Sequence, residues 1–179
     1  MKTTRVGRLA ICAMLSAMSF ILSNYLLIST EVLKVSFEGV PILVAAFLFG
    51  WKAGAAVGIV GIGLAQLVSP WGISVTTPLW ILPFALSGLF VGMYLNRKKF
   101  TLTRWELILT IAINEVMITL MNTGVIYIDR RAVGGLPHEA ALVAILAPLP
   151  LRALICFVKV VIYILVLPLL LKAIRKIEK

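Results

Sequence analysis

The sequence predicts an all-α integral membrane protein, a bundle of six transmembrane helices that forms one domain over residues 1–179. Hydrophobic residues make up 61% of the chain and charged residues 13%, more apolar surface than a soluble domain of this size can bury. The apolar residues fall in runs of about 16 to 25, and each is about long enough to cross a ~30 Å hydrocarbon layer as a helix. The basic residues gather beside one set of helix ends, as in membrane proteins.

The first three predicted helices cover residues 8–28, 37–50 and 53–68. The second is short for a transmembrane helix, so we expect a tilted or partly re-entrant course for it. On the first helix, Ala13 and Ala17 are small residues one turn apart, which allow another helix to approach closely. They form either an internal packing face or a smooth surface for another membrane subunit.

The last three predicted helices cover residues 79–95, residues 105–128, and a segment from Pro148 or Pro150 to residue 171. Proline is tolerated in the first turn of a helix, so it can begin the last one. The loop at 69–78 is uncharged and rich in turn-forming residues. Six helices place both ends of the chain on the same side of the membrane.

The basic residues fix the orientation of this predicted bundle. Most of the 17 lysines and arginines lie on the same side as the amino terminus: Lys2, Arg5, Arg8, Lys52, Arg97, Lys98, Lys99, Arg104, Lys172, Arg175, Lys176 and Lys179. Lys34, Arg130 and Arg131 fall on the other side. Because cytoplasmic loops carry the excess of Lys and Arg, both termini are predicted to be cytoplasmic. The net charge of +10 then reflects orientation in the lipid bilayer rather than nucleic acid binding.

Two charged residues lie near the middle of predicted helices. Glu115 is about eleven residues from the cytoplasmic end of its helix and Lys159 about eleven from the outer end of the last helix, which places both near mid-membrane. A charge at this depth is costly and indicates either an ion pair or a function. Two interpretations stay open: Glu115 and Lys159 form a structural ion pair, or one of them contacts a ligand.

Arg152 lies in the first turns of the last helix, on the outer side. Asn122 and Thr123 of the fifth helix lie at a similar depth, so these residues can form a polar cavity that binds an anion. The alternative is that Arg152 reaches water or pairs with Asp129 or Glu139 of the preceding loop.

Two tryptophans, Trp71 and Trp80, flank the turn that contains Thr77 on the same outer side. Aromatic residues at this depth often serve as interface anchors. The alternative is that Trp80 stacks on a flat ligand above Arg152, with the preceding loop acting as a lid.

An intramembrane enzyme needs paired carboxylates, a metal cluster or a nucleophile with its base inside the helices, and the sequence shows no such set. His138 is predicted to be a solvated residue of the external loop, and Cys12 and Cys156 to be buried as small apolar side chains. We predict no catalytic residue, metal or cofactor. Without a Gly-rich phosphate loop, any ATP chemistry must come from another polypeptide.

Three segments carry a family resemblance: Lys34-Val35-Ser36-Phe37-Glu38-Gly39-Val40-Pro41-Ile42, Leu48-Phe49-Gly50, and the small-residue repeat from Ala13 to Ala17. With them the chain resembles, over most of its length, the substrate-binding S components of energy-coupling factor transporters. The resemblance implies a plasma-membrane subunit of an ABC-type importer that binds a vitamin from outside with high affinity. It also implies a shared transmembrane coupling subunit, contacted by Ala13 and Ala17, and two ATPase subunits.

Within that family the chain is most similar to the folate-specific members, through residues 76–83, 89–92 and 121–123 and through Arg152. It departs from them at Ser87, in a stretch where they commonly have an arginine. Another vitamin such as pantothenate, a nucleobase-like compound, an intramembrane enzyme and a ligand-free scaffold are the alternatives.

The resemblance to the folate-specific members implies a role for each residue of the outer site. Trp80 would stack on the ring, Asn122 and Thr123 would bind its polar edges, and Arg152 would bind a carboxylate. The predicted substrate-binding residues are Arg152, Asn122, Thr123, Trp80, Thr77, Ser36, Phe37 and Lys159.

Overall fold

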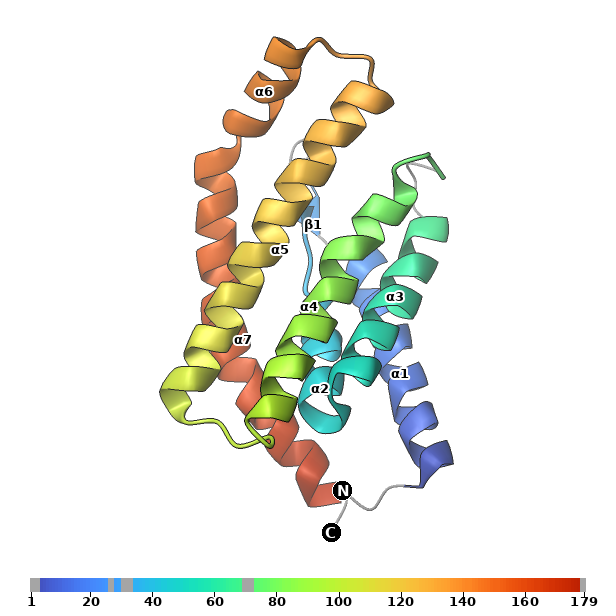
Figure 1. The fold of residues 1–179 in the computed structure, drawn as a ribbon, viewed down its shortest axis with the longest axis vertical. Helices are drawn as coiled ribbons and strands as arrows, with labels where there is room; N and C mark the ends of the chain where they lie inside the picture. The colour runs from blue at the N-terminus through green and yellow to red at the C-terminus, as the bar shows by residue number, and fades with distance from the viewer. Residues whose placement is uncertain (1–3, 26–27, 30–33, 69–72, 178–179) are drawn as a thin grey trace.

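The computed structural model describes residues 4–25, 28–29, 34–68 and 73–177, with the backbone alone for 28–29, 34–35 and 173–177. Over these residues the chain forms seven helices and one antiparallel pair of two-residue strands (Figure 1). The elements are α1 (Arg5–Asn24), β1 (Ile28–Ser29), β2 (Lys34–Val35), α2 (Gly39–Phe49), α3 (Trp51–Leu67), α4 (Thr77–Arg97), α5 (Arg104–Ala132), α6 (His138–Leu146) and α7 (Leu149–Ile177). Apart from the small strand pair, the predicted helical class is confirmed.

Two stretches differ from their predicted structure. The first helix ends at Asn24 rather than at residue 28, because Ile28 pairs with Val35 in the strand pair. The predicted external loop contains α6, which begins after Pro137. The described residues therefore hold one more helix than the six predicted.

Within the part of the chain that the structure describes, four helices are long and apolar enough to cross a membrane: α1, α4, α5 and the Leu149–Lys172 part of α7. α2 and α3 are apolar but shorter. At ~1.5 Å per residue, the 11 residues of α2 extend only about 16 Å, about half of a hydrocarbon layer. Large apolar side chains such as Val6, Leu109 and Phe157 are exposed on the long helices, as contact with lipid requires. The number of spans remains a prediction.

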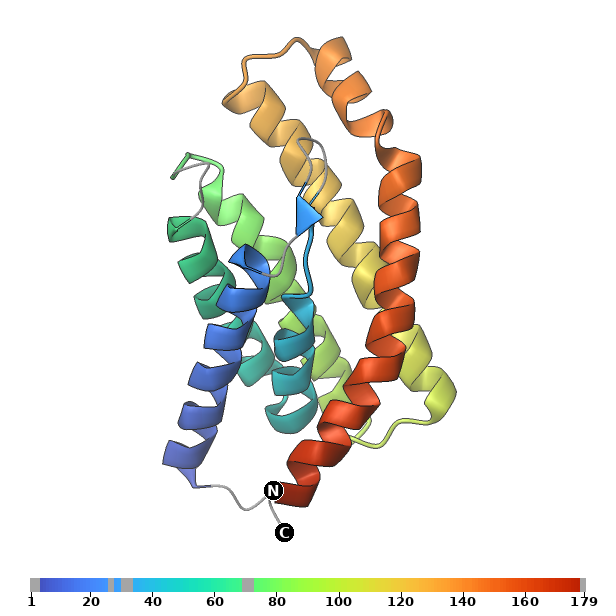
Figure 2. The same cartoon turned by 180° about the vertical axis from the view of Figure 1, so that it is seen from behind.

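The start of α1 and the end of α7 lie at the same end of the bundle, which we call the terminal end (Figures 1 and 2). The opposite end, where α6 lies, is called the α6 end. Which of them faces the cytoplasm remains a prediction from the basic residues.

α2 forms the centre of the bundle. All of its residues from Gly39 to Phe47 are buried, and it packs against α1, α3, α4 and α7. Apolar residues on every side, rather than along one stripe, are typical of a helix that other helices surround. Gly50, with a φ of 83°, ends α2 and allows α3 to begin at the next residue. Because α2 is short and follows the strand pair, it starts near mid-height of the bundle (Figure 2).

α3 and α4 form an antiparallel pair whose backbones touch. A Cβ atom on Gly54 would lie 2.7 Å from the Gly88 carbonyl oxygen, and one on Gly58 would lie 2.7 Å from the Phe84 carbonyl oxygen. Small residues at four-residue spacing allow this close approach.

α5 and α7 form a second antiparallel pair, which α6 joins at one end (Figure 1). In the half toward the terminal end, Ile111 of α5 and Leu167 of α7 belong to the apolar core. From mid-height to the α6 end, this pair carries most of the polar residues that the sequence singles out.

Candidate functional site

Three predicted site residues belong to the half of the α5–α7 pair that is nearer the α6 end: Arg152, Thr123 and Asn122. We call them the α6-end cluster. The Arg152 guanidinium donates a hydrogen bond of 3.3 Å from Nη1 to Thr123 Oγ1. The Thr123 hydroxyl donates to the Thr119 carbonyl at 2.8 Å, so the group that holds the guanidinium is itself fixed. Asn122 Oδ1 is buried and has no hydrogen-bond partner among the described residues. The similar depth that the sequence predicts for these residues is found.

The half-buried Arg152 has no carboxylate at ion-pair distance among the residues that the structure describes. Of its two alternative partners, Asp129 accepts a hydrogen bond from Thr76, and Glu139 is exposed on α6. The guanidinium therefore has donor groups available for an anion.

Lys159 and Glu115 form the buried ion pair that the sequence allows. Lys159 Nζ lies 2.9 Å from Glu115 Oε2, and the two side chains are 13% and 1% exposed. The distance between Nζ and Oε2 makes this contact an ion pair, but its geometry is not that of a hydrogen bond. The Asn114 side-chain amide lies 3.5 Å from the other carboxylate oxygen, Oε1. The ion pair joins α5 to α7 and supports a structural role for Lys159.

The amino end of α2 brings a second carboxylate to this ion pair. Glu38 is 5% exposed, its Oε2 has no hydrogen-bond partner among the described residues, and it interacts electrostatically with Lys159 and Tyr163. A Cβ atom on Gly39 would lie 3.0 Å from the Tyr163 hydroxyl and 3.6 Å from Glu115 Oε1. The start of α2 therefore contacts both α5 and α7. The residues that meet here form the central cluster: Glu38, Asn114, Glu115, Lys159 and Tyr163.

The two clusters occupy successive levels of the same helix pair. On α5, Asn122 follows Glu115 by seven residues, and on α7, Lys159 follows Arg152 by seven. Seven residues make nearly two helical turns, so the members of each pair share a helix face and lie about 10.5 Å apart along the axis.

Two of the other predicted substrate-binding residues lie beside the central cluster. Ser36 is buried, and the Phe37 ring lies 6.4 Å from the Tyr163 ring. Their position follows from the short α2, whose first residue lies at the height of the Lys159–Glu115 ion pair. Whether they contact a substrate remains a prediction.

The remaining predicted contacts lie at the start of α4. Thr77 Oγ1 accepts a hydrogen bond of 2.9 Å from the Ser74 backbone N–H, so this side chain stabilises the turn. Trp80 is half-buried, and no hydrogen bond or ring contact among the described residues joins it to Arg152. Trp71 lies outside the described residues. The proposed stacking of Trp80 on a ligand stays a prediction.

Two other predicted features lie away from both clusters. Ala13 and Ala17 are exposed on α1 and therefore available to another subunit. His138 is exposed, but the prediction that it lies in a loop is wrong, because it is the first residue of α6. Its Nδ1 lies 2.7 Å from the Tyr127 hydroxyl, a contact that joins the start of α6 to α5.

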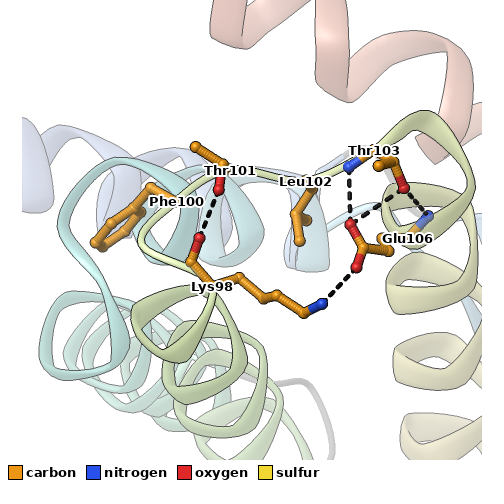
Figure 3. Close-up of a pocket in the computed structure, with 6 residues that line it drawn as sticks. All are labelled: Lys98, Phe100, Thr101, Leu102, Thr103 and Glu106. Atoms are coloured by element: carbon orange, nitrogen blue, oxygen red, sulfur yellow. Dashed lines mark hydrogen bonds and ion pairs between the residues drawn. The ribbon is translucent and has the colours of Figure 1, made fainter.

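A pocket at the terminal end lies in the α4–α5 connection (Figure 3). It is lined by Lys98, Phe100, Thr101, Leu102, Thr103 and Glu106. Lys98 Nζ lies 2.6 Å from Glu106 Oε1, and this hydrogen bond raises the pKa of the Lys98 ammonium. The other Glu106 oxygen accepts from Thr103 in a capping box. Because its polar groups satisfy one another, this open pocket lacks the unpaired groups that mark a ligand site.

Sequence reasoning missed three members of the central cluster. Tyr163 follows Lys159 by four residues and thus shares its helix face, a signal that the sequence does contain. Asn114 directly precedes Glu115. The burial of Glu38 has no local signal, because it depends on the strand pair returning the chain to mid-height.

The comparisons with known proteins agree with this architecture. Residues 7–171 match the family model described as "ECF transporter, substrate-specific component". The fold resembles a crystal structure of the S component for biotin from an ECF-type ABC transporter, with a TM-score of 0.60 and 17% identity. That likeness covers 92% of this chain and 94% of the other. A sequence search of curated proteins finds no match. The chain belongs to the family of substrate-specific components of ECF transporters, which are membrane-embedded substrate-binding subunits rather than enzymes.

Proposed function

We propose that this subunit captures a carboxylate-bearing vitamin, with folate favoured by the sequence resemblance, from outside the plasma membrane. In this proposal the chain is one domain with six spans, both termini are cytoplasmic, and α6 lies at the outer surface. The chain docks on a transmembrane coupling subunit through Ala13 and Ala17, and two ATPase subunits supply the energy.

The observation that carries this proposal is that Arg152 has no carboxylate partner among the described residues. A guanidinium in an apolar bundle is costly unless an anion or water compensates it, and Thr123 is its one side-chain partner among the described residues. A vitamin carboxylate can accept two parallel hydrogen bonds from a guanidinium, which a neutral hydroxyl cannot. Thr123 therefore acts as a support that orients Arg152 toward its ligand.

Pantothenate and biotin are the main alternatives within the same function, since each carries a carboxylate. Biotin is included among these alternatives because the similar solved structure is an S component for biotin. An intramembrane enzyme is the alternative from another class. It would require turnover by the isolated chain, whereas a binding subunit returns its ligand unchanged.

The test is ligand binding by the purified protein. Mass spectrometry of the protein after mild purification identifies a co-purifying vitamin, and calorimetry with folate, pantothenate and biotin ranks the affinities. We expect Arg152→Ala to weaken binding by about 30-fold or more, equivalent to about 2 kcal/mol, because a buried charge-assisted bond is lost.

The matched control is Arg130→Ala. Arg130 is an exposed arginine near the same end of α5, and its replacement should leave the affinity unchanged. Binding of none of these vitamins would refute the proposed function. Unchanged affinity in Arg152→Ala would refute the assigned site while leaving the function open to a different site.

The docking proposal has a separate test. Ala13→Leu together with Ala17→Leu places bulky side chains on the exposed face of α1. We expect this variant to keep its vitamin affinity and to lose co-purification with the coupling subunit. A complex that forms normally would contradict a contact through this face.

A further inference from the structure

The buried polar atoms that lack partners share one chemical property. Among the described residues they are Glu38 Oε2, Ser87 Oγ, Asn114 Oδ1, Glu115 Oε2, Asn122 Oδ1 and Tyr163 Oη. The carboxylate and amide oxygens can only accept hydrogen bonds, and the two hydroxyls can accept as well as donate. Glu115 Oε2 already faces the Lys159 ammonium at 2.9 Å, so the oxygens that lack a hydrogen-bond donor are those of Glu38, Asn114 and Asn122, and the two hydroxyls can be completed by a donor or an acceptor.

These acceptors converge on one part of the fold. All except Ser87 belong to α5, to α7 or to the residue that precedes α2, and four of them lie in the central cluster. The Gly39 backbone lies next to both the Tyr163 hydroxyl and the Glu115 carboxylate, which shows that the three elements meet at this point. Tyr163 is fully buried, so its hydroxyl is directed into the protein interior rather than toward lipid.

Charge adds a second constraint on what can bind here. The central cluster combines two carboxylates, Glu38 and Glu115, with one ammonium, Lys159. Acceptors and negative charge therefore exceed donors and positive charge. The α6-end cluster has the opposite character, because Arg152 provides a positive charge without a carboxylate partner among the described residues.

We infer that the ligand is a small carboxylate whose far end is a neutral head rich in N–H or O–H donors. Its carboxylate binds Arg152, and its head binds the unpaired oxygens of Asn114 and Glu38 and the Tyr163 hydroxyl about 13–17 Å deeper, about three helical turns along the pair. This inference rests on the proposed function and narrows it, because it excludes vitamins that lack the carboxylate or the donor-bearing head.

A panel of vitamins tests both ends of the ligand. Biotin, folate and pantothenate carry a carboxylate and a donor-bearing head. Lipoate has the carboxylate and side chain of biotin but a ring without N–H groups, and riboflavin has donors but no carboxylate. We expect at least one of the first three to bind about tenfold or more tightly than both lipoate and riboflavin, since each lost pairing costs about a factor of ten.

The outcomes of this panel separate the two proposals. Tightest binding by lipoate or riboflavin would overturn the ligand class while leaving the vitamin-binding role intact. If none of the five binds, the proposed function fails, and the ligand class fails with it.

Variants assign the two ends to the two clusters. The probes are the tightest-binding acid of the panel and its primary amide, which removes the negative charge. In the unchanged protein the acid should bind about tenfold more tightly than the amide, and Arg152→Gln should abolish this preference. Asn114→Leu should weaken acid and amide alike, by about tenfold, and leave the preference unchanged.

The matched control is Thr110→Val, one turn from Asn114 on α5, whose hydroxyl already donates to the Glu106 carbonyl. If Asn114→Leu does not fold, Tyr163→Phe removes a single hydroxyl and tests the same cluster. If the variant that folds binds the ligand with unchanged affinity, then water rather than the ligand satisfies the polar groups of the central cluster. That result would overturn the inference.

Discussion

The two antiparallel helix pairs of this bundle make contact through different kinds of residue. α3 and α4 meet through glycines, and their contact leaves no space between the backbones of Gly54 and Gly88. α5 and α7 meet through charged and polar side chains, with Lys159–Glu115 at mid-height and Arg152–Thr123 nearer the α6 end. Among the described residues the first pair has one buried polar atom without a hydrogen-bond partner, Ser87 Oγ, whereas the second retains several.

This difference indicates a division of roles. Close backbone contact between α3 and α4 gives stability that needs no ligand, because van der Waals contact is already saturated. Unpaired buried acceptors between α5, α7 and the start of α2 lower the stability of the empty protein, and a ligand that supplies donors recovers it. We therefore expect ligand binding to stabilise the α5–α7 side more than the α3–α4 side.

The largest effect is expected from breaking the central ion pair. Lys159→Met leaves Glu115 buried without a counter-charge, so we expect the free energy of unfolding to fall by about 3–5 kcal/mol. Denaturation in detergent, followed by circular dichroism, measures the change. The double variant Lys159→Met with Glu115→Leu removes both charges and should lose much less. If the double variant loses as much as the sum of the single variants, the ion pair is not coupled.

The glycine contact of the other pair should give the next largest effect. In Gly88→Ala the new Cβ would overlap the Gly54 carbonyl group, which belongs to a backbone and cannot rotate away. We expect a loss of about 1–3 kcal/mol in the same denaturation experiment. The matched control is Gly124→Ala on α5, where no described atom beyond the adjacent helix backbone and chain neighbours lies within 4 Å of the added Cβ. This control should be neutral or stabilising by about 0.5–1 kcal/mol. Equal losses in the two variants would contradict the contrast between the pairs.

The sequence predicts the polar contacts of the α5–α7 pair better than it predicts the local structure around them. Counting residues from the helix ends places Glu115 opposite Lys159 and Arg152 level with Thr123, and the structure forms both contacts. This works because straight helices convert residue number directly into depth. The site roles of these residues remain predictions.

The features that the sequence does not predict depend on segments shorter than a membrane span. α6 has nine residues, too few for the apolar runs by which the other helices are recognised. Its start signal, Pro137 followed by Glu139 in the first turn, is present in the sequence. The burial of Glu38 depends on the strand pair that precedes it and on a tertiary contact, in which the Ser19 hydroxyl of α1 donates to the Glu38 backbone carbonyl at 2.6 Å.

The smallest effect is expected where the two helix pairs meet at the α6 end. Thr76, which precedes α4, donates a hydrogen bond to the Asp129 carboxylate near the end of α5. Thr76→Val removes this donor at constant shape, and we expect a loss of about 1 kcal/mol, because Asp129 is half-buried and can recover a bond from water.

A double-mutant cycle with Asp129→Ala isolates the energy of this contact, because neither single variant can form the bond. Because the bond joins the two pairs beside the α6-end cluster, its loss should also speed exchange of amide protons at the start of α4 while leaving those in the middle of α3 unchanged. Equal acceleration in both places would mean that the two pairs open as one unit, and the contrast between a self-sufficient pair and a ligand-dependent pair would not hold.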